Sequence, residues 1–124
     1  MTTSTRTAID NYYGSWASGE LRRDRYDAAV SDDLEFRGSI DSVDGKEPFW
    51  AAVQEFKQLA QSVTVHAKVI DGDEGFVLYD CHTQPLGDLR FAEHFKVVDG
   101  KISQIRLVFD SIKLRPLMEQ LRGN

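Results

Sequence analysis

Four segments in the second half of the sequence alternate between apolar and polar residues, and tight turns separate them. The segments span 63–70, 76–83, 89–98 and 102–109. Such period-two alternation is typical of β-strands with one buried face. Asp99 and Gly100, between the last two segments, are a strong hairpin signal because both tolerate the positive φ of a type I′ turn. We therefore expect a meander of long antiparallel strands.

The first third of the sequence shows helical spacing instead. Apolar and aromatic residues recur at helical intervals in a segment that Ser4 or Thr5 can cap and that Gly19 ends. A second, short helix is expected over about 21–30. The alternating segment 34–38 then predicts a strand.

A longer third helix is expected next. Asp44 with Glu47 resembles a capping box, and the helical apolar spacing continues to about Gln61. A short C-terminal helix should follow a cap at Asp110 or Ser111. Helices followed by a meander predict an α+β fold, in which long twisted strands curl round the third helix as a cone-shaped half-barrel with one open mouth. The 124 residues suit a single domain, 1–124.

The charge balance and the composition disfavour several partners. Fifteen basic against twenty acidic residues give a net charge of −5, which opposes binding to the phosphates of nucleic acid. No apolar run approaches the roughly 20 residues of a membrane span, and no signal peptide is visible, so we expect a soluble cytoplasmic protein. The single cysteine, Cys81, is expected to be structural. The three histidines match no metal motif, and we expect no cofactor.

Three stretches resemble the SnoaL-like domains of the nuclear transport factor 2-like superfamily. They read NYYGSWASGELRRDRYDAAVSDDLEFRGSI, DGKEPFWAAVQEF and AEHFKVVDGKISQIRLVFD, and the resemblance extends over nearly the whole chain. It implies a cystatin-like, cone-shaped α+β barrel that is commonly dimeric through its sheet. The superfamily includes steroid isomerases, polyketide cyclases, epoxide hydrolases, dehydratases and non-catalytic binding domains, so the fold alone does not select an activity.

Glu93 is the main candidate for a catalytic residue. Alternation places it on one strand face with Phe91, Phe95 and Val97, where an ionised carboxylate is costly without a partner. By resemblance to the ketosteroid isomerases, Glu93 matches the position of the acid in their oxyanion hole, and Tyr12 matches its tyrosine. The alternative is a structural role, in which Glu93 pairs with an arginine or a tyrosine and holds the barrel together.

Asp80 and His82 form a second candidate constellation, because alternation places them on one face of their strand. A carboxylate beside a histidine can select the imidazole tautomer, so this pair could be a general base with its orienting partner. The alternative puts both side chains on the outer face of the sheet or in a dimer interface. In that case the odd-numbered residues of the strand point inward. The sequence leaves both readings open.

The usual bases of the resembling enzymes are missing. The position of the isomerase base falls at Gly38, and one carboxylate position of the epoxide hydrolases falls at Leu107. Neither residue can accept a proton. Asp110, at the end of the last strand, either caps the segment that follows or acts as a base at the mouth of the cone.

These observations favour a small-molecule enzyme without a cofactor, acting by proton transfer on an apolar carbonyl compound in an isomerase- or cyclase-type reaction. Glu93 and Tyr12 would stabilise an enolate, with Asp80 and His82 as the base. The residues expected to line an apolar ligand pocket are Trp16, Trp50, Phe95, Leu107 and Phe109. The rival hypothesis is a non-catalytic domain that binds a ligand or forms a homodimer through its sheet.

Overall fold

The computed structural model describes residues 4–84 and 86–122. Its elements are, in chain order, α1 (Thr5–Trp16), α2 (Arg23–Ala29), β1 (Val30–Arg37), β2 (Ser42–Asp44), α3 (Lys46–Lys57), β3 (Ala60–Asp71), β4 (Glu74–Thr83), β5 (Gly87–Val98), β6 (Lys101–Val108) and α4 (Leu114–Leu121). The predicted order of helices and strands is confirmed, and β2 is an additional short strand that the sequence pattern did not indicate.

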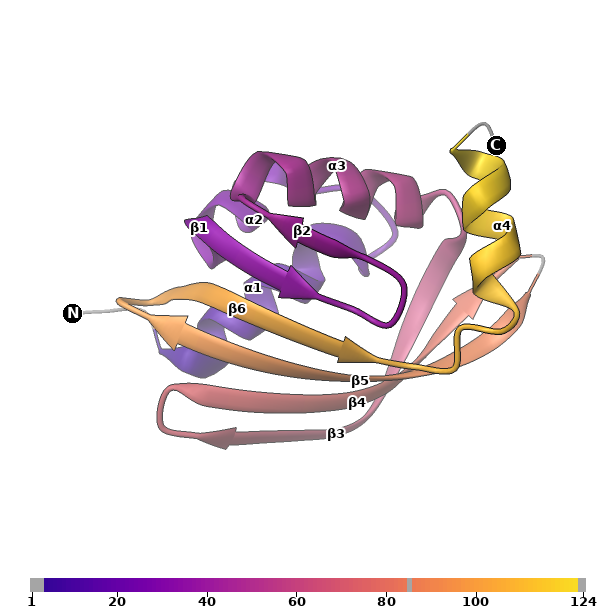
Figure 1. The fold of residues 1–124 in the computed structure, drawn as a ribbon. Coiled ribbons are helices and arrows are strands. Elements are labelled where there is room, and N and C mark those ends of the chain that lie inside the picture. Colours follow the sequence, from indigo (N-terminus) through magenta and orange to yellow (C-terminus); the bar gives the residue numbers. More distant parts are fainter. Residues whose placement is uncertain (1–3, 85, 123–124) are drawn as a thin grey trace.

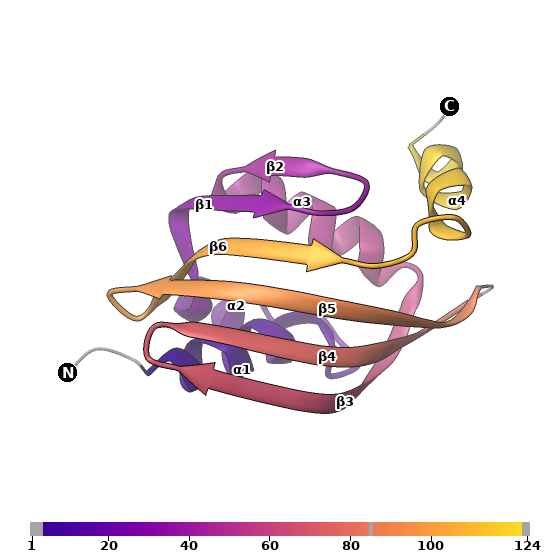
Figure 2. The same ribbon diagram turned by 60° about the horizontal axis from the view of Figure 1, so that its bottom comes forward.

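The strands form one curved sheet in the order β2-β1-β6-β5-β4-β3. Neighbouring strands are antiparallel except β1 and β6, which run parallel. The helices α1, α2 and α3 lie against one face of the sheet, and α4 stands at the end where β6 leaves it (Figure 1, Figure 2). This arrangement confirms the predicted α+β fold with a curved, mostly antiparallel sheet, which stays open along its edges.

The turn between β5 and β6 has the predicted geometry. Asp99 and Gly100 have φ values of 51° and 79°, and Val98 pairs with Lys101 across the turn. Positive φ at both central residues is the requirement of a type I′ turn. The register of β5 and β6 shifts between Lys96 and Val97, and beyond this irregularity Glu93 lies opposite Leu107.

The start of α3 differs from the predicted capping box. The N-cap residue of the helix is Gly45, whose φ of 101° suits glycine and which has no side chain to cap the first turn. Asp44 instead belongs to β2, where it pairs with Glu35. Glu47 turns toward α2 and accepts hydrogen bonds from Arg23, one of them 2.8 Å long. The Asp44 carboxylate accepts a hydrogen bond from Arg37 (3.0 Å), so both carboxylates of the expected box bond to arginines and not to the start of α3.

The end of α3 also differs, because the helix stops at Lys57 rather than near Gln61. Ala60 already pairs with Thr83 as the first ladder contact between β3 and β4. The backbone of this segment is thus hydrogen-bonded into the sheet, which local apolar spacing could not reveal.

The core lies between the helices and the inner face of the sheet. The inner face of β4 and β5 is formed by their odd-numbered residues, and the apolar side chains that fill it include Val77, Tyr79, Phe91 and Phe95. From the helices, α1 contributes Ile9, Tyr12 and Trp16, and α3 contributes Phe49 and Val53. Burial of each such side chain stabilises the fold by about 1.5–3 kcal/mol.

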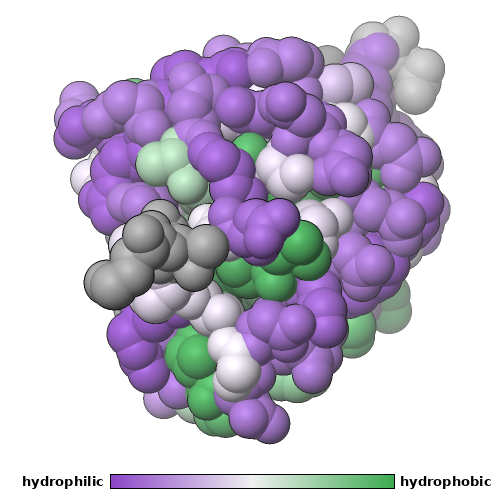
Figure 3. Space-filling model, turned by 90° about the vertical axis from the view of Figure 1, so that its left-hand side faces the viewer, coloured by the Kyte–Doolittle hydropathy of each residue, from purple (hydrophilic) through white to green (hydrophobic). Residues whose placement is uncertain are grey.

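The two ends of the molecule differ in character. The end that carries the β3–β4 and β5–β6 turns is mostly hydrophilic, with small separate apolar areas (Figure 3). The opposite end carries α4 (Figure 1), and there Leu114 and Met118 of this helix join the residues that line an apolar pocket. Within the described residues, no helix combines the length and the apolar character needed to cross a bilayer.

Candidate functional site

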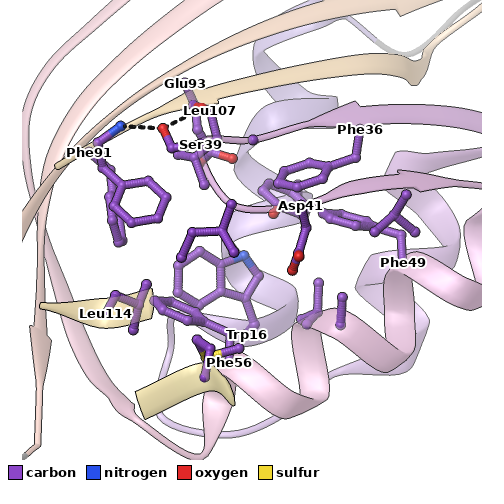
Figure 4. A pocket seen from close by; sticks show the side chains of 18 of the residues that line it. Trp16, Phe36, Ser39, Asp41, Phe49, Phe56, Phe91, Glu93, Leu107 and Leu114 are labelled. Carbon is purple, nitrogen blue, oxygen red and sulfur yellow. Dashed lines mark hydrogen bonds between the residues drawn. The ribbon is translucent and has the colours of Figure 1, made fainter. Parts of the chain in front are cut away.

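An apolar pocket opens beside α4, between α1, α3 and the inner face of the sheet (Figure 4). Its volume is about 100 Å³. Most of the lining is aromatic or aliphatic, and the few polar groups include Glu93, Ser39, Asp41 and Arg122. A mostly apolar hollow with a few polar groups is the usual form of a small-molecule site.

Glu93 is almost completely buried, with 2% of its surface exposed. Its Oε1 atom accepts hydrogen bonds from the hydroxyl groups of Tyr13 (2.6 Å) and Tyr79 (2.9 Å). Burial raises the pKa of Glu93 from its ordinary value of 4.5 to about 7, although the two hydroxyl groups favour the ionised form. The carboxyl group therefore changes its charge near neutral pH.

The two oxygens of Glu93 have different surroundings. Both tyrosine hydroxyls bond to Oε1, and no hydrogen bond from the described residues reaches Oε2. Burial raises the pKa of both Tyr13 and Tyr79 well above the usual value, so the hydroxyls remain donors. Because Oε1 already accepts two hydrogen bonds, the proton of the neutral acid resides on Oε2. From there it can be donated to a molecule in the pocket.

The tyrosine that contacts Glu93 from α1 is Tyr13 and not the expected Tyr12. Adjacent residues on a helix point about 100° apart, so the sequence could not tell which of the two faces the strand. Tyr12 still lines the pocket, and its hydroxyl bonds to none of the described residues. Tyr79 was not anticipated as a partner. Its position on β4 could have indicated this contact. Val77 pairs directly with Glu93, so Tyr79, two residues further along β4, lies diagonal to Glu93 on the inner face.

Asp80 and His82 lie on the outer face of the sheet, away from the pocket. The Asp80 carboxylate bonds to the Arg90 guanidinium (2.8 Å) and to His66 (2.9 Å), and Arg90 holds the pKa of Asp80 well below its usual range. His82 bonds instead to the Asp88 carboxylate (2.6 Å). The prediction that Asp80 and His82 point inward as a pair is therefore wrong. The odd-numbered neighbours on β4 fill the core, so the even-numbered residues face outward.

The expected pocket residues divide into two groups. Trp16, Leu107 and Phe109 line the pocket. Phe95 is fully buried beneath it, and Trp50 lies on another side of α3, with its ring 4.5 Å from that of Tyr26. Phe95 and Trp50 were therefore placed wrongly. On α3 the adjacent Phe49 takes the inward direction, which leaves Trp50 facing α2.

One structural alternative required an arginine to pair with Glu93. Among the described residues, no arginine bonds to it. Arg106 bonds to Glu35 (2.6 Å) and Arg90 to Asp80. At the strand end, Asp110 accepts a hydrogen bond from the backbone N–H of Ile112 (3.0 Å). It therefore supports the turn before α4 and does not line the pocket, whereas α4 itself begins at Leu114.

The mouth of the pocket contains an ion cluster that the sequence did not reveal. Arg122, just after α4, forms a two-pronged pair with Asp41 in the β1–β2 loop, and one of its hydrogen bonds is 3.1 Å long. Its Nε atom also donates to Glu55 on α3 (2.9 Å). Leu114 and Met118 of α4 are buried against the pocket. The cluster thus ties α4 over the mouth, and it joins residues too distant in sequence to be paired by pattern.

Metal binding has no support in this geometry. Among the residues that the structure describes, no three His, Cys, Asp or Glu side chains gather closely enough to hold a metal ion. Cys81 is buried, and burial raises the pKa of its thiol to about 12, so it remains protonated. The groups that line the pocket are therefore an apolar surface, the carboxyl group of Glu93 and a few other polar side chains.

The fold is an α+β cone that contains an apolar pocket. A family model for the SnoaL-like domain matches residues 9–105, and the chain belongs to this family. No match was found among curated protein sequences.

Solved structures share this fold over nearly the whole chain. A protein from Kribbella flavida DSM 17836 is 27% identical over 98% of this chain and 95% of that chain, with a TM-score of 0.76. An NTF2-like protein of unknown function from Cytophaga hutchinsonii ATCC 33406 is 15% identical, over 94% of this chain and 96% of that chain (TM-score 0.73). An LEH-like epoxide hydrolase from M. tuberculosis is 20% identical, over 96% and 92% respectively (TM-score 0.73). The last two likenesses concern the fold alone.

Proposed function

We propose that the pocket binds a small, mostly apolar carbonyl compound and that Glu93 exchanges a proton with it, in an isomerase- or cyclase-type reaction without a cofactor. The observation that carries this proposal is a buried carboxyl group with a pKa near 7 at the wall of an apolar pocket. A general acid–base group is most effective when its pKa lies near the working pH.

The proposed step is a proton transfer that leaves the oxidation state unchanged. Ionised Glu93 takes a proton from the carbon next to the carbonyl group, and the electron pair moves onto the carbonyl oxygen as an enolate. Protonated Glu93 then returns the proton to the same or another carbon. The Tyr12 hydroxyl, which burial keeps protonated, is a donor that can stabilise the enolate oxygen. Asp80 and His82 have no part in this step. The cytoplasm is the proposed location, a setting that suits a free buried cysteine.

Hydrogen–deuterium exchange at the α-carbons of cyclohexanone, followed by NMR in D2O, tests this function. We expect the protein to accelerate exchange above the buffer rate, with a rate that rises through about pH 7 as Glu93 ionises. Glu93→Gln should lose about 100-fold or more of the acceleration, because proton transfer by a positioned side chain contributes roughly that much. Glu20→Gln, at an exposed position, is the matched control and should keep the wild-type rate. No acceleration by the wild-type protein would refute the catalytic proposal.

A second function, homodimerisation through the sheet, is favoured by the outer face. An apolar row crosses four strands there, formed by Ala67, Leu78, Ala92 and Val108. Val69 and Phe76 pair beside this row and are 60% and 56% exposed. A two-fold dimer uses the same patch on both subunits, and a continuous apolar row suits such self-pairing. This function is compatible with a ligand-binding pocket on the other face.

Sedimentation velocity tests the proposed dimer. We expect the wild-type protein to sediment as a dimer and Leu78→Glu to sediment as a monomer, because two glutamates would meet in the apolar row. Ile112→Glu is the matched control. Ile112 is 79% exposed but lies outside the sheet, so this variant should remain dimeric. A monomeric wild-type protein, or a dimeric Leu78→Glu variant, would contradict this interface.

A further inference from the structure

The indole N–H of Trp16 is a buried donor without an acceptor. Trp16 is 3% exposed, and its Nε1 atom has no hydrogen-bond partner among the described residues. Three other buried polar side chains are paired: Ser15 donates to a backbone carbonyl of α1, Thr83 to that of Gly87, and Glu93 accepts from Tyr13 and Tyr79. The hydroxyl of the buried Tyr12, beside Trp16, is a second group without a hydrogen bond among the described residues. Because buried polar groups are normally satisfied, an orphaned donor at a pocket wall suggests that a ligand completes it.

The position of Trp16 directs this donor into the pocket. Its ring is held edge-on against Tyr12 (centroids 6.2 Å apart) and Phe56 (5.9 Å apart). In Figure 4 the nitrogen lies on the edge of the indole that faces the open part of the pocket and not the Phe56 ring. Burial raises the pKa of the Tyr12 hydroxyl, and the indole lies close enough to lower it in part. No hydrogen bond with the required geometry joins the two groups.

We propose that the Trp16 N–H binds the carbonyl oxygen of a small, neutral, apolar ligand. This inference rests on the proposed function and names the group that recognises the ligand's polar atom. An indole nitrogen is a donor only, so the ligand atom that it meets must be an acceptor. Of the acidic groups in the pocket lining, Asp41 is paired with Arg122, whereas Glu93 has no cationic partner and disfavours an anionic ligand. A neutral carbonyl compound fits both conditions.

The size of the pocket limits the range of possible ligands further. Its volume of about 100 Å³ lies below the roughly 300–1,000 Å³ of sites for drug-sized molecules. It is closer to the engineered cavity of about 150 Å³ that holds one benzene molecule. With α4 tied over the mouth by Arg122, the pocket therefore suits a single six-membered ring. Polycyclic ligands do not fit this arrangement.

The test uses the two tryptophans of the chain as reporters in one protein sample. Indole N–H signals are followed in ¹H–¹⁵N spectra during titration with cyclohexanone and, separately, with methylenecyclohexane, which has the same ring shape but no acceptor. We expect both compounds to bind and only the ketone to move the Trp16 N–H proton downfield. Trp50 lies outside the pocket, so its signal should stay in place in both titrations.

A matched pair of variants separates the donor from the aromatic surface. Trp16→Phe should weaken cyclohexanone binding by roughly threefold to tenfold, as expected for one neutral hydrogen bond, and should change methylenecyclohexane binding by less than about twofold. Trp50→Phe should change neither affinity. Because the downfield shift is read in the wild-type protein, the test does not depend on the folding of a variant.

The outcomes distinguish this inference from the function on which it rests. If both compounds bind but the Trp16 signal responds equally to both, the donor role is wrong and the pocket remains a small-molecule site. Equal losses of both affinities in Trp16→Phe would likewise refute the donor role, since only packing would then be involved. If neither compound binds to the wild-type protein, the proposed small-molecule function fails, and the Trp16 inference fails with it.

Discussion

Replacing Glu93 with glutamine is expected to stabilise the protein by about 3 kcal/mol above pH 7 and to change its stability little below pH 4.5. The cause is the raised pKa of the buried carboxyl group. Between pH 4.5 and about 7 the unfolded chain loses the Glu93 proton while the folded protein keeps it. The folded state is therefore progressively disfavoured as the pH rises through this window, and the loss is complete above the folded pKa. Glutamine does not titrate, so the variant does not show this loss of stability.

Urea denaturation of both proteins at a series of pH values measures this effect. The difference between the two unfolding free energies should grow by about 1.4 kcal/mol per pH unit within the window and then level off. Titrations of other groups occur in both proteins and cancel in the difference. Glu20→Gln, at an exposed loop position, serves as the control and should follow the wild-type curve. A constant difference between Glu93→Gln and wild type across the range would show that the pKa of Glu93 is not raised.

Replacing Phe95 with alanine is expected to destabilise the protein by about 3–5 kcal/mol. Phe95 is fully buried, and its ring lies 5.7 Å from that of Tyr12 and 5.8 Å from that of Tyr13, centroid to centroid. The truncation removes apolar contact area and leaves a cavity beneath the two tyrosines. Because Tyr13 donates to Glu93, the loss also loosens the support of the proposed acid–base group.

Urea denaturation at pH 7 tests this expectation. Ile112→Ala, at a position 79% exposed, is the control and should stay within about 0.5 kcal/mol of wild type. A loss below about 1 kcal/mol in Phe95→Ala would mean that the site collapses around the smaller side chain and that the contacts with Tyr12 and Tyr13 contribute little. The proposed acid–base role of Glu93 would not be affected by that result.

Two opposing influences act on the pKa of Glu93 in the wall of the pocket. Burial favours the neutral form of Glu93, and the hydroxyls of Tyr13 and Tyr79 favour the ionised form. A carboxylate paired with arginine would instead remain ionised at neutral pH, as Asp80 does beside Arg90 on the outer face. The contrast explains why the pKa of the inner carboxyl group is raised and that of the outer one is lowered.

The sequence by itself determined the order of the helices and the longer strands, the β5–β6 turn and the apolar strand face on which Glu93 lies. These features depend on residues that are near one another along the chain: the positive φ of Asp99 and Gly100, and the alternation of Phe91, Glu93 and Phe95. Alternation on β4 was equally visible, but it did not show which face points inward.

Only the tertiary structure decided three features: which face of β4 points inward, whether Tyr12 or Tyr13 bonds to Glu93, and which ion pairs form across the mouth of the pocket. Each of these depends on what packs against an element and not on its own pattern. Tyr79 points inward because α1 covers that side of the sheet, and Asp80 consequently meets Arg90 in solvent. Arg122 meets Asp41 because the chain returns α4 to the β1–β2 loop. Local periodicity specifies that two faces exist, whereas the burial of one of them is a property of the assembled layers.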